Sequence, residues 1–142
     1  EESAELIQRA HENDVPILCG SESGFSITPY GEWHYKELEV FVNALGFNPI
    51  EAIKAATSES GKHAGFGGEI GSIIPGKLAD FILIEGDPSN DVTILGDKSR
   101  IDSVYVGGEL MNTEPLPVRG PISGWRTSQY SSSILTKDKA EG

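Results

Sequence analysis

A short apolar run that ends in a glycine-bounded acidic loop constrains this chain most. Val15-Pro16-Ile17-Leu18-Cys19 is followed at once by Gly20-Ser21-Glu22-Ser23-Gly24. Short apolar runs of this kind are typical of strands that are buried on both faces. Residues 2–13 precede the run and repeat apolar side chains at helical spacing, so they predict an amphipathic helix. A helix, a tight turn and a buried strand make one step of an α/β pattern.

Two further helices are predicted after this loop. Residues 35–45 place apolar side chains at the i, i+3, i+4, i+7 positions of a helix, which Gly46 ends. Asn48-Pro49-Ile50-Glu51 predicts the start of the next helix, because asparagine caps helices, proline suits the first turn and Glu51 can complete a capping box. We expect this helix to run to about Gly61, with a short helical turn as far as Ala64.

The second half of the chain reads as β-rich. Phe81–Ile84 predicts a buried strand, and Ile101–Val106 with Glu109–Met111 predicts a hairpin around Gly107-Gly108. Residues 113–142 have no periodicity and are rich in proline and serine, so we expect an extended or disordered tail there. Three apolar tail residues could pin it to a neighbouring surface: Trp125, Tyr130 and Ile134.

Length and charge exclude several classes of protein. The chain has 142 residues, whereas a complete (β/α)8 barrel needs about 250. Its formal net charge of −11 disfavours nucleic acids and anionic membrane surfaces as partners. No signal peptide and no apolar run of ~20 residues occur, and the only cysteine, Cys19, cannot form an internal disulfide. We therefore expect a cytoplasmic protein with a buried, structural Cys19, and its opening in mid-helix suggests that other sequence precedes it.

Glu22 and His34 are the residues that best fit a reactive site. Glu22 follows the predicted strand, where α/β enzymes place ligands, and its carboxylate can bind a metal or accept a proton. The alternative is a turn whose carboxylate faces solvent. His34 either contacts a substrate or simply begins a helix, whereas His11 and His63 are expected at the surface. No HxH, HExxH or CxxC motif occurs, so a self-contained metal site is not expected.

Taken together and in order, these segments resemble the end of the amidohydrolase superfamily, in its imidazolonepropionase-like and prolidase-like branch. Residues 15–24 resemble the family's last barrel strand, which usually ends Gly-Thr-Asp-Ser-Gly, and residues 71–80 are close to its "GSIxPGKxADxxxx" signature. The resemblance covers residues 1 to about 112. Its other marks are His34 with Glu37-Leu38, Asn48–Ile53, Ala55-Ala56-Thr57, Gly86-Asp87-Pro88 and Val104–Gly108.

The resemblance implies an α/β fold that is the C-terminal fragment of a (β/α)8 TIM barrel plus C-terminal strands of a small β-sandwich. Residues 1–64 would form the last helix–strand–helix segment of the barrel. Residues 65–112 would form part of the composite β-sandwich, and residues 113–142 the tail. Within the signature, Asp80 would fix a local backbone arrangement at the start of a strand, and would not be catalytic.

The resemblance also implies metal-dependent chemistry. The family uses one or two divalent metals, usually zinc, to activate a water molecule. Of its ligand positions only the last falls in this chain, at Glu22, which would be both a metal ligand and the catalytic carboxylate, with His34 and Tyr30 on the substrate side. Glu22 replaces the usual aspartate, and its extra methylene displaces the carboxylate by about 1 Å, an error that can lower a rate ~100-fold.

These implications predict part of a metal-dependent hydrolase that acts on C–N bonds in a small-molecule substrate. Zinc or another divalent metal belongs to the intact protein, and this chain alone is expected to hold none and to be inactive. We expect an oligomer, completed by the N-terminal remainder of the hydrolase or by another copy of the chain. Two alternatives stay open: one subunit of a split hydrolase, and a non-catalytic scaffold or binding fragment.

Overall fold

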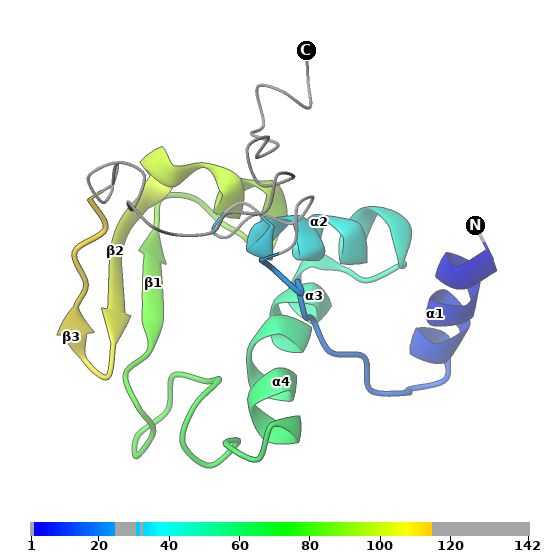
Figure 1. Ribbon diagram of the computed structural model, residues 1–142, viewed down its shortest axis with the longest axis horizontal. Coiled ribbons are helices and arrows are strands. Elements are labelled where there is room, and N and C mark those ends of the chain that lie inside the picture. The colour runs from blue at the N-terminus through cyan, green and yellow to red at the C-terminus, as the bar shows by residue number, and fades with distance from the viewer. Residues whose placement is uncertain (1, 25–30, 32, 115–142) are drawn as a thin grey trace, which may run out of the picture.

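The computed structural model describes residues 2–24, 31 and 33–114. In Figure 1 the sheet lies at one side, α2 to α4 occupy the centre, and α1 lies at the opposite side near the N-terminus. The elements in chain order are α1 (Glu2–Glu12), α2 (His34–Ala44), α3 (Pro49–Ala56), α4 (Ser58–His63), β1 (Phe81–Ile84), η1 (Val92–Gly96), η2 (Lys98–Arg100), β2 (Ile101–Val106) and β3 (Glu109–Leu110).

The core lies where α2, α3 and η1 meet. The helical spacing predicted for residues 35–45 is confirmed, because α2 turns Leu38 and Phe41 inward and Leu45 follows at its end. Phe41 also packs its ring against Phe47, with centroids 4.8 Å apart. The buried apolar residues are Leu38, Phe41, Leu45, Phe47, Ala52, Ala55 and Val92.

The predicted capping box at the start of α3 is confirmed. The Glu51 N–H donates to Asn48 Oδ1 at 3.0 Å, and the Asn48 N–H donates to Glu51 Oε2 at 2.8 Å. The helix ends at Ala56, earlier than the predicted Gly61, because Thr57 leaves the helical region with φ −123° and ψ −88°. A separate helix, α4, starts at the next residue.

Polar residues of helix α1 hold it to the core. His11, expected at the surface, is half-buried: its ring stacks on Phe47 with centroids 3.7 Å apart, and its Nε2 lies 3.4 Å from Glu51 Oε2. Gln8 Nε2 also donates to the Ala44 carbonyl at 2.8 Å. No residue of α1 is buried. The sequence predicted the amphipathic helix but did not indicate which residues attach it to the core.

The prediction of a strand at Val15–Cys19 is wrong. The segment lies in neither helix nor strand, and Val15 and Leu18 are 51% and 42% exposed. Its inner side packs against the core through Ile17 and Cys19, and the Cys19 N–H donates to the Ala55 carbonyl at 3.3 Å. A strand forms only beside a second strand that pairs its backbone groups, and the sheet of the described residues does not include this segment. For the same reason Cys19 is only half-buried.

The described strands form an antiparallel sheet in the order β1-β2-β3. The predicted hairpin is confirmed: Val106 pairs with Glu109, and Gly107 and Gly108 have φ of +58° and +83°, as a two-residue primed turn requires. The strand at Phe81–Ile84 is confirmed, but its predicted burial is wrong, because Ile82 and Leu83 are exposed on this three-stranded sheet.

The Pro75–Asp80 signature has a structural role in this fold. As expected, Asp80 fixes local backbone, since its Oδ1 accepts the Gly107 N–H at 2.6 Å. Lys77 Nζ donates to the carbonyls of Gly67 and Ile70, at 2.6 and 3.0 Å, and so closes the glycine-rich loop after α4. Within the described residues, no helix is both long enough and apolar enough to cross a membrane.

Candidate functional site

A hydrogen bond joins the Gly20–Gly24 loop to the start of α2. Ser21 Oγ lies 2.8 Å from His34 Nδ1 and 2.8 Å from Ser23 Oγ. His34 is the first residue of α2, so the first turn of this helix orients the ring toward the loop. The sequence indicated His34 and Glu22 but missed Ser21, although a serine on each side of Glu22 was the available signal.

Glu22 has a backbone conformation that L-residues seldom adopt. Its φ is +48°, in the left-handed region, and its side chain is exposed. For a non-glycine residue this conformation costs about 1–2 kcal/mol. Such strain persists where the surroundings impose it, and it clusters at functional sites. The structure therefore sets an exposed carboxylate in a loop that is tied to α2 through its neighbour Ser21.

Ser21 and His34 form the polar edge of a pocket of about 380 Å³. The opposite wall is apolar and comes from α2, α3, η1 and the sheet. This arrangement suits a ligand with an apolar body and one polar end. The remaining lining residues are Cys19, Gly31, Tyr35, Leu38, Ala56, Ile82, Leu95 and Ile101.

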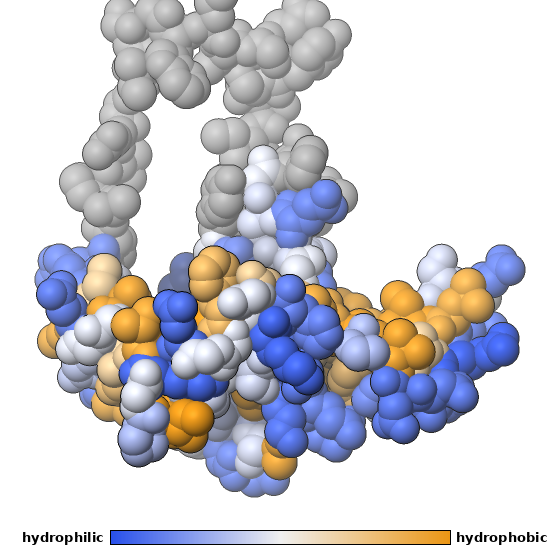
Figure 2. All heavy atoms as spheres, turned by 90° about the horizontal axis from the view of Figure 1, so that it is seen from below, coloured by the Kyte–Doolittle hydropathy of each residue, from blue (hydrophilic) through white to orange (hydrophobic). Residues whose placement is uncertain are grey.

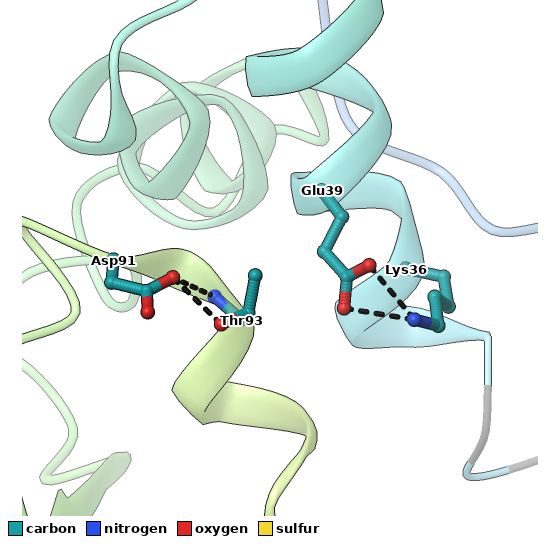
Figure 3. A network of polar contacts seen from close by, with 4 residues as sticks. All are labelled: Lys36, Glu39, Asp91 and Thr93. Carbon is teal, nitrogen blue, oxygen red and sulfur yellow. Dashed lines mark hydrogen bonds and ion pairs between the residues drawn. The ribbon is translucent and has the colours of Figure 1, made fainter.

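Polar contacts fix two of the elements that line the pocket, α2 and η1 (Figure 3). On α2, Lys36 Nζ donates to both carboxylate oxygens of Glu39, at 3.0 and 2.8 Å. On the facing segment, Asp91 Oδ1 accepts the N–H and the hydroxyl of Thr93, at 2.9 and 2.7 Å, and so caps η1. These two hydrogen bonds lower the pKa of the Asp91 carboxyl, and the bond from the Thr93 hydroxyl has the larger effect.

Cys19 lines the pocket with a thiol that is weakly ionised. Burial, and then the negative charge of Glu37, raise the pKa of the Cys19 thiol from 9.0 to about 11. A thiol with so high a pKa carries almost no thiolate near neutral pH. This supports the structural role expected for Cys19 from the sequence.

The described residues do not by themselves fit a metal ion. No group of three or more histidine, cysteine, aspartate or glutamate side chains lies close enough to hold one in this part of the chain. The imidazole of His34 is engaged with Ser21. Glu22 could therefore supply one carboxylate ligand of a site whose other ligands come from elsewhere. Tyr30, the third candidate from the sequence, lies outside the described residues.

Comparison with known proteins gives one consistent relationship. The sequence profile of the amidohydrolase family matches residues 2–111. Adenine deaminase 3 of Rhizobium meliloti (strain 1021) is 33% identical over 95 residues, which are 67% of this chain and 14% of the deaminase. Imidazolonepropionase of Solibacter usitatus (strain Ellin6076) is 34% identical over 65 residues, which are 46% of this chain and 16% of that protein.

Solved structures extend the relationship to the fold. A candidate prolidase from Bifidobacterium longum superposes with a TM-score of 0.71 and 30% identity, over 82% of this chain and 28% of the prolidase chain. This chain therefore spans only a minor part of the length of each relative.

Proposed function

The chain belongs to the amidohydrolase family, and from that premise we propose that it is one part of a metal-dependent hydrolase that cleaves C–N bonds. The similarity to a deaminase, an imidazolonepropionase and a candidate prolidase supports this reaction class. Because the chain covers 14% and 16% of the curated relatives, the complete activity would need polypeptide beyond it. We expect the complete protein to fold as a barrel, as the prolidase-like resemblance implies. Residues 1–64 would form part of that barrel.

Glu22 is the residue to which we assign proton transfer. The observation that carries this assignment is its positive φ within a loop held to α2 by the Ser21–His34 hydrogen bond. A carboxylate presented by this loop can accept a proton from the attacking water. A divalent metal such as zinc, bound mainly by side chains outside the described residues, would supply the activation of that water.

His34 and the pocket beside it are assigned to the substrate. The imidazole lies at the polar edge of the pocket and can hydrogen-bond a polar substrate group, while the apolar wall accepts an apolar substituent. The placement of Tyr30 on the substrate side remains a prediction from the sequence.

One observation favours a second candidate, a subunit of a split hydrolase that another polypeptide completes. The Val15–Gly20 segment is neither helix nor strand, exposes Val15 and Leu18, and pairs with no described strand. An unpaired, apolar segment readily pairs with another chain. The partner would be the N-terminal remainder of the hydrolase or a second copy of this chain.

The test uses protein purified from its own source through a tag on this chain, so that covalent extensions and partners are retained. Bound metal is quantified, and hydrolysis is measured on N-acyl amino acids, Xaa-Pro dipeptides and aminopurines. We expect a divalent metal to copurify, and Glu22→Gln to lower kcat/KM by about 100-fold or more, in the range of lost general-base catalysis. Glu12→Gln, at an exposed glutamate of α1, is the matched control and should have no effect.

Other outcomes separate the candidates. A separate polypeptide that copurifies with metal and activity supports the split hydrolase. If Glu22→Gln leaves the activity unchanged, Glu22 has no role in proton transfer. Protein with neither metal nor hydrolysis is the non-catalytic scaffold that the sequence left open.

A further inference from the structure

Exposed apolar side chains recur over the surface of this chain, among them Leu6, Leu18 and Val40. Figure 2 shows hydrophobic side chains interspersed with hydrophilic ones on one face of the molecule. In the hydrolase proposed above, polypeptide beyond this chain would cover part of such surface, because the chain spans only a minor part of each relative. Hydrogen bonds inside the chain do not depend on that cover, and one set of them lies on both sides of Glu22.

The Ser21 hydroxyl is the point at which the Gly20–Gly24 loop and α2 meet. Ser21 Oγ lies 2.8 Å from Ser23 Oγ, and also 2.8 Å from Nδ1 of His34, the first residue of α2. A hydroxyl has one donor and two acceptor sites, so Ser21 can donate to one of these partners and accept from the other. One side chain therefore makes a contact inside the loop and a contact to the helix at the same time.

Both contacts bear on the backbone of Glu22. The contact between Ser21 and Ser23 spans Glu22, so its geometry depends on the conformation of that residue. Glu22 has φ +48°, which is unfavourable for an L-residue in isolation and persists only where the surroundings impose it. The net contribution of two hydrogen bonds is of the same order as this strain. The two Ser21 contacts are therefore strong enough to hold Glu22 in the left-handed region.

We propose that Ser21 is a positioning residue for proton transfer by Glu22: its hydrogen bonds to His34 and Ser23 hold the Glu22 backbone in the left-handed conformation from which the carboxylate reaches the attacking water. This role rests on the function proposed above. A change of φ at Glu22 moves its whole side chain, and a misplacement of about 1 Å can lower a rate ~100-fold. Ser21 also lines the pocket, so a role in substrate binding is the alternative that the tests separate.

The first test measures stability and needs no activity. In protein purified with its extensions and partners, Glu22→Gly should raise the urea midpoint, because glycine adopts a positive φ without strain. In the Ser21→Ala background the same change should give no gain, since Glu22 has already relaxed there. Ser21→Thr keeps the hydroxyl and should preserve the gain. Ser89→Ala, which removes a hydroxyl that donates to Asp87, is the matched control and should also preserve it.

The second test measures kinetics on the same protein, with a substrate that it hydrolyses in the assay above. Ser21→Ala should lower kcat at least about tenfold and leave KM within about twofold, as expected for a misplaced catalytic group. Ser21→Thr should restore most of kcat. Added to Glu22→Gln, Ser21→Ala should cause no further loss, because no proton-accepting carboxylate is left to position.

Three results would overturn the proposal. The gain from Glu22→Gly is absent from the wild type, or is equally large in the Ser21→Ala variant. KM rises while kcat is unchanged in Ser21→Ala, which assigns Ser21 to substrate binding. Ser21→Ala causes the same loss with and without Glu22→Gln, so that it acts independently of Glu22. Failure of the proposed function is distinguishable from these results, because Glu22→Gln alone then leaves the activity unchanged, whereas the urea midpoints still report whether Ser21 holds the Glu22 backbone.

Discussion

The carboxylate of Asp80 accepts the backbone N–H of Gly107 at 2.6 Å, across 27 residues of sequence. Next to it, the Gly108 N–H donates to the Ala79 carbonyl at 3.0 Å. The turn between β2 and β3 is thereby held against the start of β1. A two-residue turn with both φ values positive depends on glycine, and here a distant side chain also fixes it.

Asp80→Ala should lower the free energy of unfolding by about 1–2 kcal/mol, because it removes a hydrogen bond with a charged acceptor. Asp80→Asn keeps an acceptor oxygen in place and should lose less than half as much. Urea unfolding monitored by circular dichroism measures both. Equal losses for the two variants would show that the charge of Asp80, and not its hydrogen bond, stabilises the turn.

Gly71→Ala should destabilise the fold by more than about 2 kcal/mol, through left-handed strain together with a steric clash. Gly71 has φ +83°, and a Cβ there would lie 2.8 Å from the Thr57 carbonyl oxygen. Gly68→Ala is the matched control, since a Cβ at Gly68 meets nothing within 4 Å. Thermal unfolding of both variants checks the difference, and similar melting temperatures would contradict the packing of this loop on α4.

Glu22→Gly should raise the free energy of unfolding by about 1 kcal/mol, because glycine adopts a positive φ without strain. Asp14, with φ +56° after α1, provides the control, and Asp14→Gly should give a similar gain. In the hydrolase assay only the Glu22 variant should lose activity. A Glu22→Gly variant less stable than the wild type would show that the side-chain contacts of Glu22 outweigh its backbone strain.

The Cys19 thiol should react slowly with iodoacetamide. A rise of its pKa from 9.0 to about 11 lowers the thiolate fraction at pH 8 about 100-fold. The alkylation rate of the folded protein should therefore be at least that much lower than in urea, and should keep rising with pH up to about 11. Mass spectrometry of quenched samples gives both rates, and a plateau near pH 9 would rule out the raised pKa.

Stability should fall in acid partly through Asp91 and Asp97. Hydrogen bonds from Thr93 and Ser99 respectively, chiefly from their hydroxyls, lower the pKa of these carboxyls below the usual 3.8. The stabilisation is therefore present above pH 3.8 and is lost as pH falls through the lower folded-state pKa values, because the unfolded chain takes up protons first.

Thr93→Val removes the strongest donor to Asp91 and should flatten the decline of the urea midpoint below about pH 4. Thr93→Ser keeps the hydroxyl and should reproduce the wild-type slope. Identical slopes for all three proteins would mean that the Asp91 contact contributes nothing to acid sensitivity.

Local sequence determined the parts of this protein that neighbouring residues can settle. The spacing of Leu38, Phe41 and Leu45 gave α2 and its buried face, and Asn48 with Glu51 gave the cap of α3. Gly107-Gly108 gave the hairpin. Each depends on hydrogen bonds or packing within a few residues, so its signal is complete in the sequence.

Tertiary structure decided the rest, because long-range partners leave no local signal. The run at residues 15–19 has the composition of a buried strand, yet without a strand to pair with among the described residues it stays irregular and partly exposed. His11 reads as a surface residue until Phe47 is brought beneath it. At the candidate site, the sequence supplied Glu22 and His34. Only the fold showed that Ser21 joins the loop to the helix and that Glu22 lies in a strained conformation.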